Sequence, residues 1–234
     1  YSIDQAMRSG YAWELGPFEY WDAIGFSTGI ELIESSDEVI APWIAKMKSK
    51  GFDSFYKVKD GRILYYDQGL EEYQELPLQD KKIVFNILNQ NKLVFSNTEL
   101  KLWDIGDGVL SAEFISKYNA IGEGILRGLQ EAISIAEEQG WKGLVIANNA
   151  NNFTVGANLM LIGMLAFQQE FEQLDMAVRL FQNTSMRLRY SGVPVVIATQ
   201  GYVFGGGTEF LMHCDASVCS VESYIGLVEV GVGL

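Results

Sequence analysis

The spacing of hydrophobic and polar residues divides the chain into two stretches with different rhythms. The first fifty residues have helical spacing, with Pro17 at the start of one helix. Two short runs of β-formers follow at 55–59 and 62–66, and Asp60-Gly61 between them supplies the positive φ values of a tight hairpin. We expect the helices at residues 2–7, 16–21, 28–35 and 38–50. The pattern therefore predicts a mainly helical segment with one hairpin over residues 1–67.

Residues 68–97 are polar and charged, and they separate the two patterns. A stretch of this composition is typical of a connection between domains. We therefore predict a linker over residues 68–97, with a helix near residues 80–89.

From residue 98 onward, strand patterns alternate with helical ones. A second hairpin at 100–115 is marked by Asp107-Gly108, and the long amphipathic stretch 120–139 follows it. Such alternation predicts an α/β domain, a largely parallel sheet layered with helices, over residues 98–234. The expected order after the amphipathic stretch is strand 144–147, loop 151–158, helices 159–168 and 171–190, strand 194–199, and a further helix after a glycine run. Since the chain starts at Tyr1 without Met and stops at Leu234 after an apolar stretch, we expect it to be part of a longer protein.

Charge and composition exclude several classes of partner. The chain has 17 Lys and Arg residues against 30 Asp and Glu residues, a net charge of −13, so nucleic acid is not expected as a partner. The longest apolar run, 159–167, is far shorter than the roughly 20 residues of a membrane span, and no signal pattern precedes it. Cys214 and Cys219 have no zinc-ligand spacing and are too few for a disulfide scaffold. We therefore expect a cytoplasmic protein without a membrane span or a metal site.

The chain contains a single histidine, His213. This excludes Ser-His-Asp, Cys-His and HExxH mechanisms unless a second chain supplies a group, and it leaves carboxylates to carry acid–base chemistry. Gly122, Gly124 and Gly128 have the wrong spacing for a dinucleotide fingerprint and lie in a helical pattern. We therefore expect no redox cofactor in this chain, and we expect His213 to be a packed helix residue.

Two glycine-containing loops could bind negative charge. Gly205, Gly206 and Gly207 stand between an apolar strand and a helix, where bare N–H groups and the helix dipole favour an oxyanion. The alternative is a tight turn that needs glycine only for its φ angles. Gly156 lies in a second loop, also just before a helix. Donors from two loops that converge on one oxygen would stabilise a developing enolate.

Two glutamates could move protons beside these loops. Glu209 lies in the first turn of the helix that follows the glycine run, and Glu229 lies twenty residues later, each with apolar neighbours. Burial and mutual repulsion would raise the pKa of such a carboxyl group. The alternatives are a partner of the helix dipole for Glu209 and an ordinary surface residue for Glu229.

The motifs 153–159, 201–209 and 224–234 together resemble, in order and spacing, the acyl-CoA site of the crotonase (enoyl-CoA hydratase/isomerase) family. The resemblance implies a crotonase-like repeated ββα architecture, incomplete at its C-terminus. It implies oxyanion donors at Ala157 and Gly206, and catalytic carboxylates at Glu209 and Glu229. Asn158 replaces the family's usual Asp, and Val228 its usual Pro.

The same resemblance implies a substrate-binding role for three further residues, Lys117, Gly156 and Gly205. Lys117 follows the second hairpin, where family members often carry a lysine near the CoA phosphates, and one cation there would help an acidic protein to bind an anion.

Residues 2–7 and 15–25 resemble the last part of a 3-hydroxyacyl-CoA dehydrogenase C-terminal helical domain. The resemblance implies a fused fatty-acid β-oxidation enzyme, with a dehydrogenase half outside this chain that would use NAD. The leading hypothesis is an enoyl-CoA hydratase that needs no cofactor in this chain and acts on acyl-CoA, with a homo-oligomer as a candidate assembly. The alternatives are an enoyl-CoA isomerase, which commonly manages with one carboxylate, and a non-catalytic scaffold segment.

Overall fold

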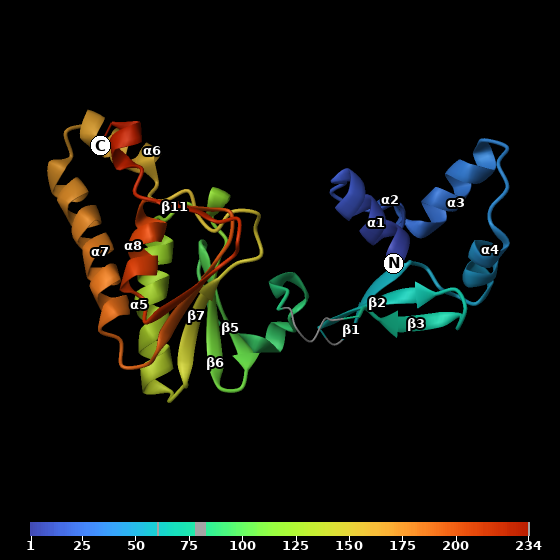
Figure 1. Ribbon diagram of the computed structural model, residues 1–234, viewed down its shortest axis with the longest axis horizontal. Helices are drawn as coiled ribbons and strands as arrows, with labels where there is room; N and C mark the ends of the chain where they lie inside the picture. The colour runs from blue at the N-terminus through green and yellow to red at the C-terminus, as the bar shows by residue number, and fades with distance from the viewer. Residues whose placement is uncertain (60, 78–82, 234) are drawn as a thin grey trace. The chain divides into compact units, whose positions relative to one another are not determined.

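The computed structural model describes residues 1–59, 61–77 and 83–233, and the chain divides into two compact units, Tyr1–Asn89 and Gln90–Leu234 (Figure 1). Each unit has a hydrophobic core of its own. The boundary between the units falls inside the expected linker 68–97. That segment, however, also contains one paired strand of each unit, β3 (Glu72–Glu75) and β4 (Leu93–Ser96).

The first unit packs four helices around an aromatic cluster. The ring centroids of Phe18, Trp21, Phe26 and Trp43 lie 4.9–5.8 Å from that of Phe55, so aromatic area supplies much of this core. The helices are α1 (Ser2–Tyr11), α2 (Pro17–Ile24), α3 (Phe26–Ser35) and α4 (Pro42–Ser49). The prediction of a helix over 38–50 was wrong at its start, because Pro42 occupies the first helical position, where its missing N–H costs nothing.

A three-stranded antiparallel sheet completes the first unit. The expected hairpin is present as β1 (Tyr56–Lys59) and β2 (Arg62–Asp67), although its turn residue Asp60 lies outside the described residues. β3 pairs with the other side of β2. Residues 80–82 of the helix expected near 80–89 also lie outside the described part, and the described remainder holds a 3₁₀ turn, Phe85–Ile87.

The second unit is built on a six-stranded mixed sheet, in the order β10-β8-β7-β6-β5-β4. The strands from β4 to β6 are antiparallel, and those from β6 to β10 are parallel, as the alternating pattern predicted. The remaining strands are β5 (Leu100–Gly106), β6 (Val109–Phe114), β7 (Gly143–Ala147), β8 (Val195–Thr199) and β10 (Ala216–Cys219).

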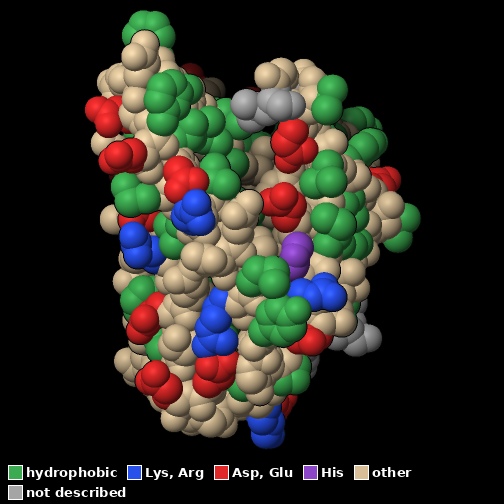
Figure 2. Space-filling model, turned by 90° about the vertical axis from the view of Figure 1, so that its left-hand side faces the viewer, with side chains coloured by type: hydrophobic (Ala, Val, Ile, Leu, Met, Phe, Trp, Pro, Cys, Tyr) green, Lys and Arg blue, Asp and Glu red, His purple; other side chains and the backbone are tan. Residues whose placement is uncertain are grey.

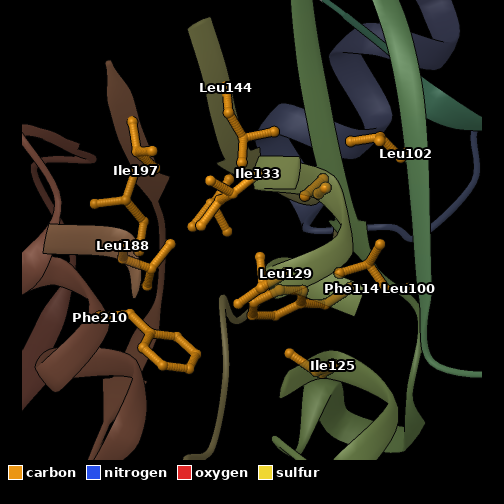
Figure 3. Packing of buried hydrophobic residues seen from close by; sticks show 14 of the residues in the cluster. Leu100, Leu102, Phe114, Ile125, Leu129, Ile133, Leu144, Leu188, Ile197 and Phe210 are labelled. Atoms are coloured by element: carbon orange, nitrogen blue, oxygen red, sulfur yellow. The ribbon is translucent and has the colours of Figure 1, made fainter. Parts of the chain in front are cut away.

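Helices α5 (Glu123–Glu138), α7 (Phe171–Arg189) and α8 (Gly206–His213) lie together beside this sheet (Figure 1). Helix α5 presents Ile125, Leu129 and Ile133 at four-residue spacing, and all three are fully buried. Figure 3 shows them packed among side chains of the strands and of α7 and α8. The strands that precede the two glycine loops, β7 and β8, are both anchored in this core.

Helix α6 (Leu159–Phe167) is apolar along its whole length, yet most of its side chains are exposed. Asn158 caps its first turn, where the side-chain oxygen accepts a hydrogen bond from the Leu161 N–H at 3.3 Å. None of the helices in the described residues is long and apolar enough to cross a membrane.

A separate pair of short parallel strands lies beyond the main sheet, β9 (Tyr202–Phe204) and β11 (Tyr224–Gly226). The loop after β7 runs along the free side of β9 through a parallel bridge between Thr154 and Val203. Three segments from distant parts of the sequence are thus held side by side.

Candidate active site

The glycine run closes tightly around the start of α8. Gly205 has φ 51° and ψ −118°, a conformation open to glycine alone. A Cβ on Gly206 would come within 2.2 Å of the Phe181 ring, and one on Gly207 within 2.2 Å of the Thr154 methyl carbon. The run therefore requires glycine for close packing as well as for φ. Among the described residues, the Gly206 N–H at the start of α8 has no hydrogen-bond acceptor.

The second loop presents the N–H group of Ala157. The Gly156 carbonyl accepts a hydrogen bond from the Ile121 N–H at 2.8 Å. Since the C=O and N–H of a trans peptide point in opposite directions, the Ala157 N–H points away from Ile121. Within the described part of the chain it too donates to no acceptor.

The two loops are in contact at the residues that directly precede these donors. A Cβ on Gly156 would lie 2.9 Å from the Phe204 carbonyl oxygen, and one on Gly205 would lie 4.0 Å from the Gly156 Cα. Two unpaired N–H groups therefore stand on neighbouring segments, which is the arrangement that an oxyanion requires.

Both predicted carboxylates lie at this junction. The Oε1 atom of Glu229, in the 3₁₀ turn Glu229–Val232, lies 2.9 Å from the Cβ position of Gly205. Glu209 stands in the first turn of α8 and is half-buried. Burial is the main cause that raises the pKa of Glu209, the nearby Glu229 charge raises it further, and His213 lowers it. A raised pKa makes the Glu209 carboxylate a stronger base than an exposed glutamate.

His213 lies closer to this site than the sequence suggested. Its side chain is half-exposed, and its Nδ1 atom lies 2.7 Å from the Glu209 carbonyl oxygen, one turn back along α8. In Figure 2 His213 (purple) is visible at the surface, with acidic side chains directly above it. The neighbouring thiol is a poor nucleophile, because burial raises the pKa of Cys214 to about 12.

Lys117 is exposed in the 3₁₀ turn Lys117–Asn119, with its ammonium group 5.4 Å from the centroid of the Tyr118 ring. The turn adjoins the second loop, since the Asn119 side chain donates a hydrogen bond to the Asn152 carbonyl at 3.2 Å. The structure thus brings the segment of Lys117 to the loop, without a contact between its ammonium group and either glutamate.

Sequence reasoning assigned no role to Thr154, whose buried hydroxyl bonds to the Asn119 carbonyl and to the Gly156 N–H. It also missed Gln200, whose amide donates to the Asn148 and Ala150 carbonyls. Their partners lie up to 52 residues away, so no local pattern marks them. The one available signal was the position of Thr154 inside the glycine motif.

A cavity of about 320 Å³ lies in the first unit, and its lining includes none of the predicted site residues. Its lining consists of Tyr1, Arg8, Glu19, Asp22, Tyr56, Lys57, Val58, Ile63 and Leu76. Across the described ranges, no group of three or more His, Cys, Asp or Glu side chains could hold a metal ion.

Comparison with known proteins decides the family. The model of the enoyl-CoA hydratase/isomerase family matches residues 106–234, more than half of the chain. The chain belongs to the enoyl-CoA hydratase/isomerase family. The crotonase resemblance of the sequence and the expected fold are thereby confirmed, and the match covers both glycine loops and both glutamates.

Solved structures agree with this membership. An enoyl-CoA hydratase/isomerase (crotonase) of Legionella pneumophila shares 27% identity over 59% of this chain and 54% of that one, with a TM-score of 0.53. An enoyl-CoA hydratase of Shewanella pealeana shares 22% identity over 58% and 52%, with a TM-score of 0.54, and shows the crotonase fold.

Longer relatives match the chain from end to end. A protein of Bacillus subtilis (strain 168) named "Probable 3-hydroxyacyl-CoA dehydrogenase" is 42% identical over 235 residues, and a Rickettsia felis protein whose name describes a trifunctional enzyme of a fatty acid oxidation complex is 32% identical over 236. The chain spans 29% of the length of each. These names agree with the resemblance of the N-terminal residues to a dehydrogenase domain.

Proposed function

We propose that the second unit is an enoyl-CoA hydratase, which adds water across the 2,3 double bond of a 2-enoyl-CoA thioester. The observation that carries the proposal is the pairing of two carboxylates from different elements, Glu209 on α8 and Glu229 after β11, beside two unpaired N–H groups. Hydration needs one group to take a proton from water and one to give a proton to carbon, whereas a double-bond shift commonly needs a single carboxylate.

The N–H groups of Ala157 and Gly206 would donate to the thioester oxygen. Negative charge develops on that oxygen when a nucleophile adds to C3, so fixed donors stabilise the transition state more than the substrate. The start of α8 adds the favourable end of its helix dipole.

The two carboxyl groups would divide the protons of one water molecule. Glu209 takes a proton from water as the water oxygen bonds to C3, and Glu229 gives a proton to C2 as the enolate collapses. Glu209 then holds the proton taken from water, C2 holds the proton given by Glu229, and proton transfer from Glu209 to Glu229 restores the starting state. The raised pKa of Glu209 suits the base in this scheme.

Helix α6 supports a substrate with an apolar tail. It begins directly after the loop that carries Ala157, and side chains such as Met160 and Phe167 are 85% and 91% exposed. An acyl chain whose carbonyl binds at Ala157 would therefore have apolar surface close by, while exposed Lys117 would attract the CoA phosphates.

The test is a pair of isosteric substitutions in the intact protein, with hydration of a 2-enoyl-CoA as the measurement. Glu209→Gln and Glu229→Gln keep the shape but not the proton, and each should lower kcat by roughly 10²–10⁴-fold. The double variant should lose less than the product of the single losses, because both groups act on one water. Glu222→Gln, an exposed acid near Glu229 in sequence, is the matched control.

Two results would contradict this proposal and favour another function. If only one substitution lowers turnover and double-bond migration persists, the unit is an isomerase. If the parent protein binds acyl-CoA without any turnover, the unit is a scaffold segment.

For the whole protein we propose a fusion of this hydratase with a 3-hydroxyacyl-CoA dehydrogenase, located in the cytoplasm. The dehydrogenase half and its NAD would lie outside the chain described. The names of the end-to-end relatives support this arrangement. Incubation of the intact protein with a 2-enoyl-CoA and NAD⁺ should produce NADH, and the yield should fall in the Glu209→Gln variant. Hydration without NADH formation would contradict the fusion.

A further inference from the structure

The side chain of Thr154 is completely buried between the two glycine loops. Its hydroxyl donates a hydrogen bond to the Asn119 carbonyl at 2.5 Å and accepts one from the Gly156 N–H at 3.0 Å. A hydroxyl can do both at once because it carries one donor and two lone pairs. Thr154 thereby joins the turn after β6 to the residue that precedes Ala157.

The backbone of Thr154 is bound to a third segment. Its N–H donates to the Tyr202 carbonyl at 3.0 Å, and its carbonyl accepts from the Phe204 N–H at 3.2 Å. β9 is thus attached to the second loop directly before the glycine run begins. Buried hydrogen bonds of this kind have strict geometry, so a shift at Thr154 moves all three segments.

The methyl group of Thr154 reaches the other oxyanion loop. Its Cγ2 atom lies 2.2 Å from the Cβ position of Gly207, the residue after Gly206. The hydroxyl of Thr154 therefore contacts Gly156, directly before the Ala157 donor. Its methyl group contacts Gly207, directly after the Gly206 donor.

We propose that Thr154 is a positioning residue, which sets the spacing and direction of the Ala157 and Gly206 N–H groups without touching substrate. The inference rests on the proposed function. Ile121 holds the Gly156–Ala157 peptide through the Gly156 carbonyl, and the Thr154 hydroxyl holds the preceding peptide through the Gly156 N–H. Removal of the hydroxyl therefore frees the Gly156 backbone, whose conformation sets the direction of the Ala157 N–H. Misplacement of an oxyanion donor weakens transition-state binding more than substrate binding.

The substitution that isolates the hydroxyl is Thr154→Val, which keeps the shape of the side chain. In the intact protein it should lower kcat for hydration by roughly 10- to 100-fold and leave KM within about threefold. Thr154→Ser retains the hydroxyl and should restore most of kcat. Thr154→Ala removes the same hydroxyl without a second methyl group beside the Asn119 carbonyl, and it should behave like Thr154→Val.

Thr184→Val is the matched control. Thr184 is equally buried, and its hydroxyl also donates one hydrogen bond, to the Leu180 carbonyl, and accepts one, from the Gln130 amide, both at 2.8 Å. These contacts join α7 to α5 rather than the glycine loops. The control should lose stability to a similar degree but keep its kcat. Equal losses of kcat in Thr154→Val and Thr184→Val would show a merely structural role and overturn the proposal.

A second measurement separates this inference from the proposed function. The infrared stretch of a ¹³C-labelled thioester carbonyl in a bound, non-reacting acyl-CoA reports hydrogen bonding to its oxygen, whether or not the protein turns substrate over. Binding to the parent should lower this frequency, and Thr154→Val should reverse part of the change while Thr154→Ser does not. If the parent lowers the frequency but never hydrates, the proposed function fails and the comparison of variants still decides the role of Thr154. An unchanged frequency in Thr154→Val and Thr154→Ala would overturn the inference.

Discussion

The carboxylate of Glu229 lies against Gly205, with its Oε1 atom 2.9 Å from the place that a Cβ would occupy. The Gly205 N–H donates at 2.9 Å to the Gly226 carbonyl, the last residue of β11. The glycine run and the segment that delivers Glu229 are therefore held together both by backbone pairing and by the absence of a side chain.

This contact predicts the effect of Gly205→Ala. The new methyl group would meet the Glu229 carboxylate in a backbone conformation that strains any residue but glycine, so we expect destabilisation by about 1–3 kcal/mol and a clear loss of hydration. Urea unfolding and steady-state kinetics measure the two effects. Gly163→Ala in α6, where a Cβ meets nothing within 4 Å, should instead leave stability equal or slightly higher. If the two variants were equally stable, the backbone strain that we infer for Gly205→Ala would be contradicted.

A second prediction concerns pH and Glu209. Its pKa is raised in the folded protein by burial and by Glu229, so its stabilising contribution is complete below the unfolded-state value of 4.5 and is lost as the pH rises through the folded-state value. Glu209→Gln should therefore melt a few degrees higher than the parent at pH 7, and the difference should shrink below about pH 4. Thermal denaturation across this pH range checks it. A difference that does not vary with pH would exclude the titration of Glu209 as its cause.

The matched control for this effect is Glu113→Gln. Glu113 is buried on β6, accepts a hydrogen bond from the Trp103 Nε1–H at 2.8 Å, and has a pKa raised mainly by burial. We expect the same dependence of stability on pH in this variant, with full hydration activity.

A third prediction tests the cation at Lys117. Lys117→Ala should raise KM for acyl-CoA by roughly 3- to 10-fold without a change in kcat, and added salt should reduce the difference. Lys142→Ala is the control, because Lys142 directly precedes β7, at the end of the strand opposite the second loop. Kinetics at low and high ionic strength make the comparison. An equal rise of KM in both variants would remove any specific role of Lys117.

The division into two units predicts the course of limited proteolysis. Each unit has its own core, so the first cleavages should fall between β3 and β4, and both products should retain their secondary structure. Mass spectrometry of the early fragments and circular dichroism of the separated products provide the check. First cleavages spread evenly over the chain would argue against independent units.

Strong local patterns made much of the fold predictable. The hairpin around Asp107-Gly108 and the amphipathic stretch of α5 each carry a turn signal or a repeating apolar face, and both formed where expected. β3 lacks such a pattern. Residues Glu72–Glu75 form a strand because they pair with β2, which is a contact that no local pattern predicts. Start points of helices were less predictable, and Pro42 shows how one residue sets them.

The residues of the candidate site were likewise predictable only where a local sequence pattern marked them. The glycine motifs and the glutamates stood out because each is a local pattern with a chemical reason for its residue types. Thr154 did not, because its hydroxyl acts through Asn119, 35 residues earlier, and through Gly156 in a folded loop. The helical pattern predicts a packed His213, whereas the structure leaves it half-exposed, because its exposure depends on which segments cover α8 rather than on the helix itself.

The parallel pairing of β9 with β11 has a consequence for how this family can diversify. For the reaction we propose, the anion-binding groups and Glu209 are carried by the loop after β7 and by the start of α8, while Glu229 arrives on a short strap held by three paired residues, Tyr224–Gly226. Changes in the strap beyond Gly226 can redirect or remove one proton carrier, while the hydrogen bond from the Gly205 N–H to the Gly226 carbonyl still holds the glycine run. New reactions on thioesters can therefore evolve through changes in one segment of the chain, while the anion-binding site is kept.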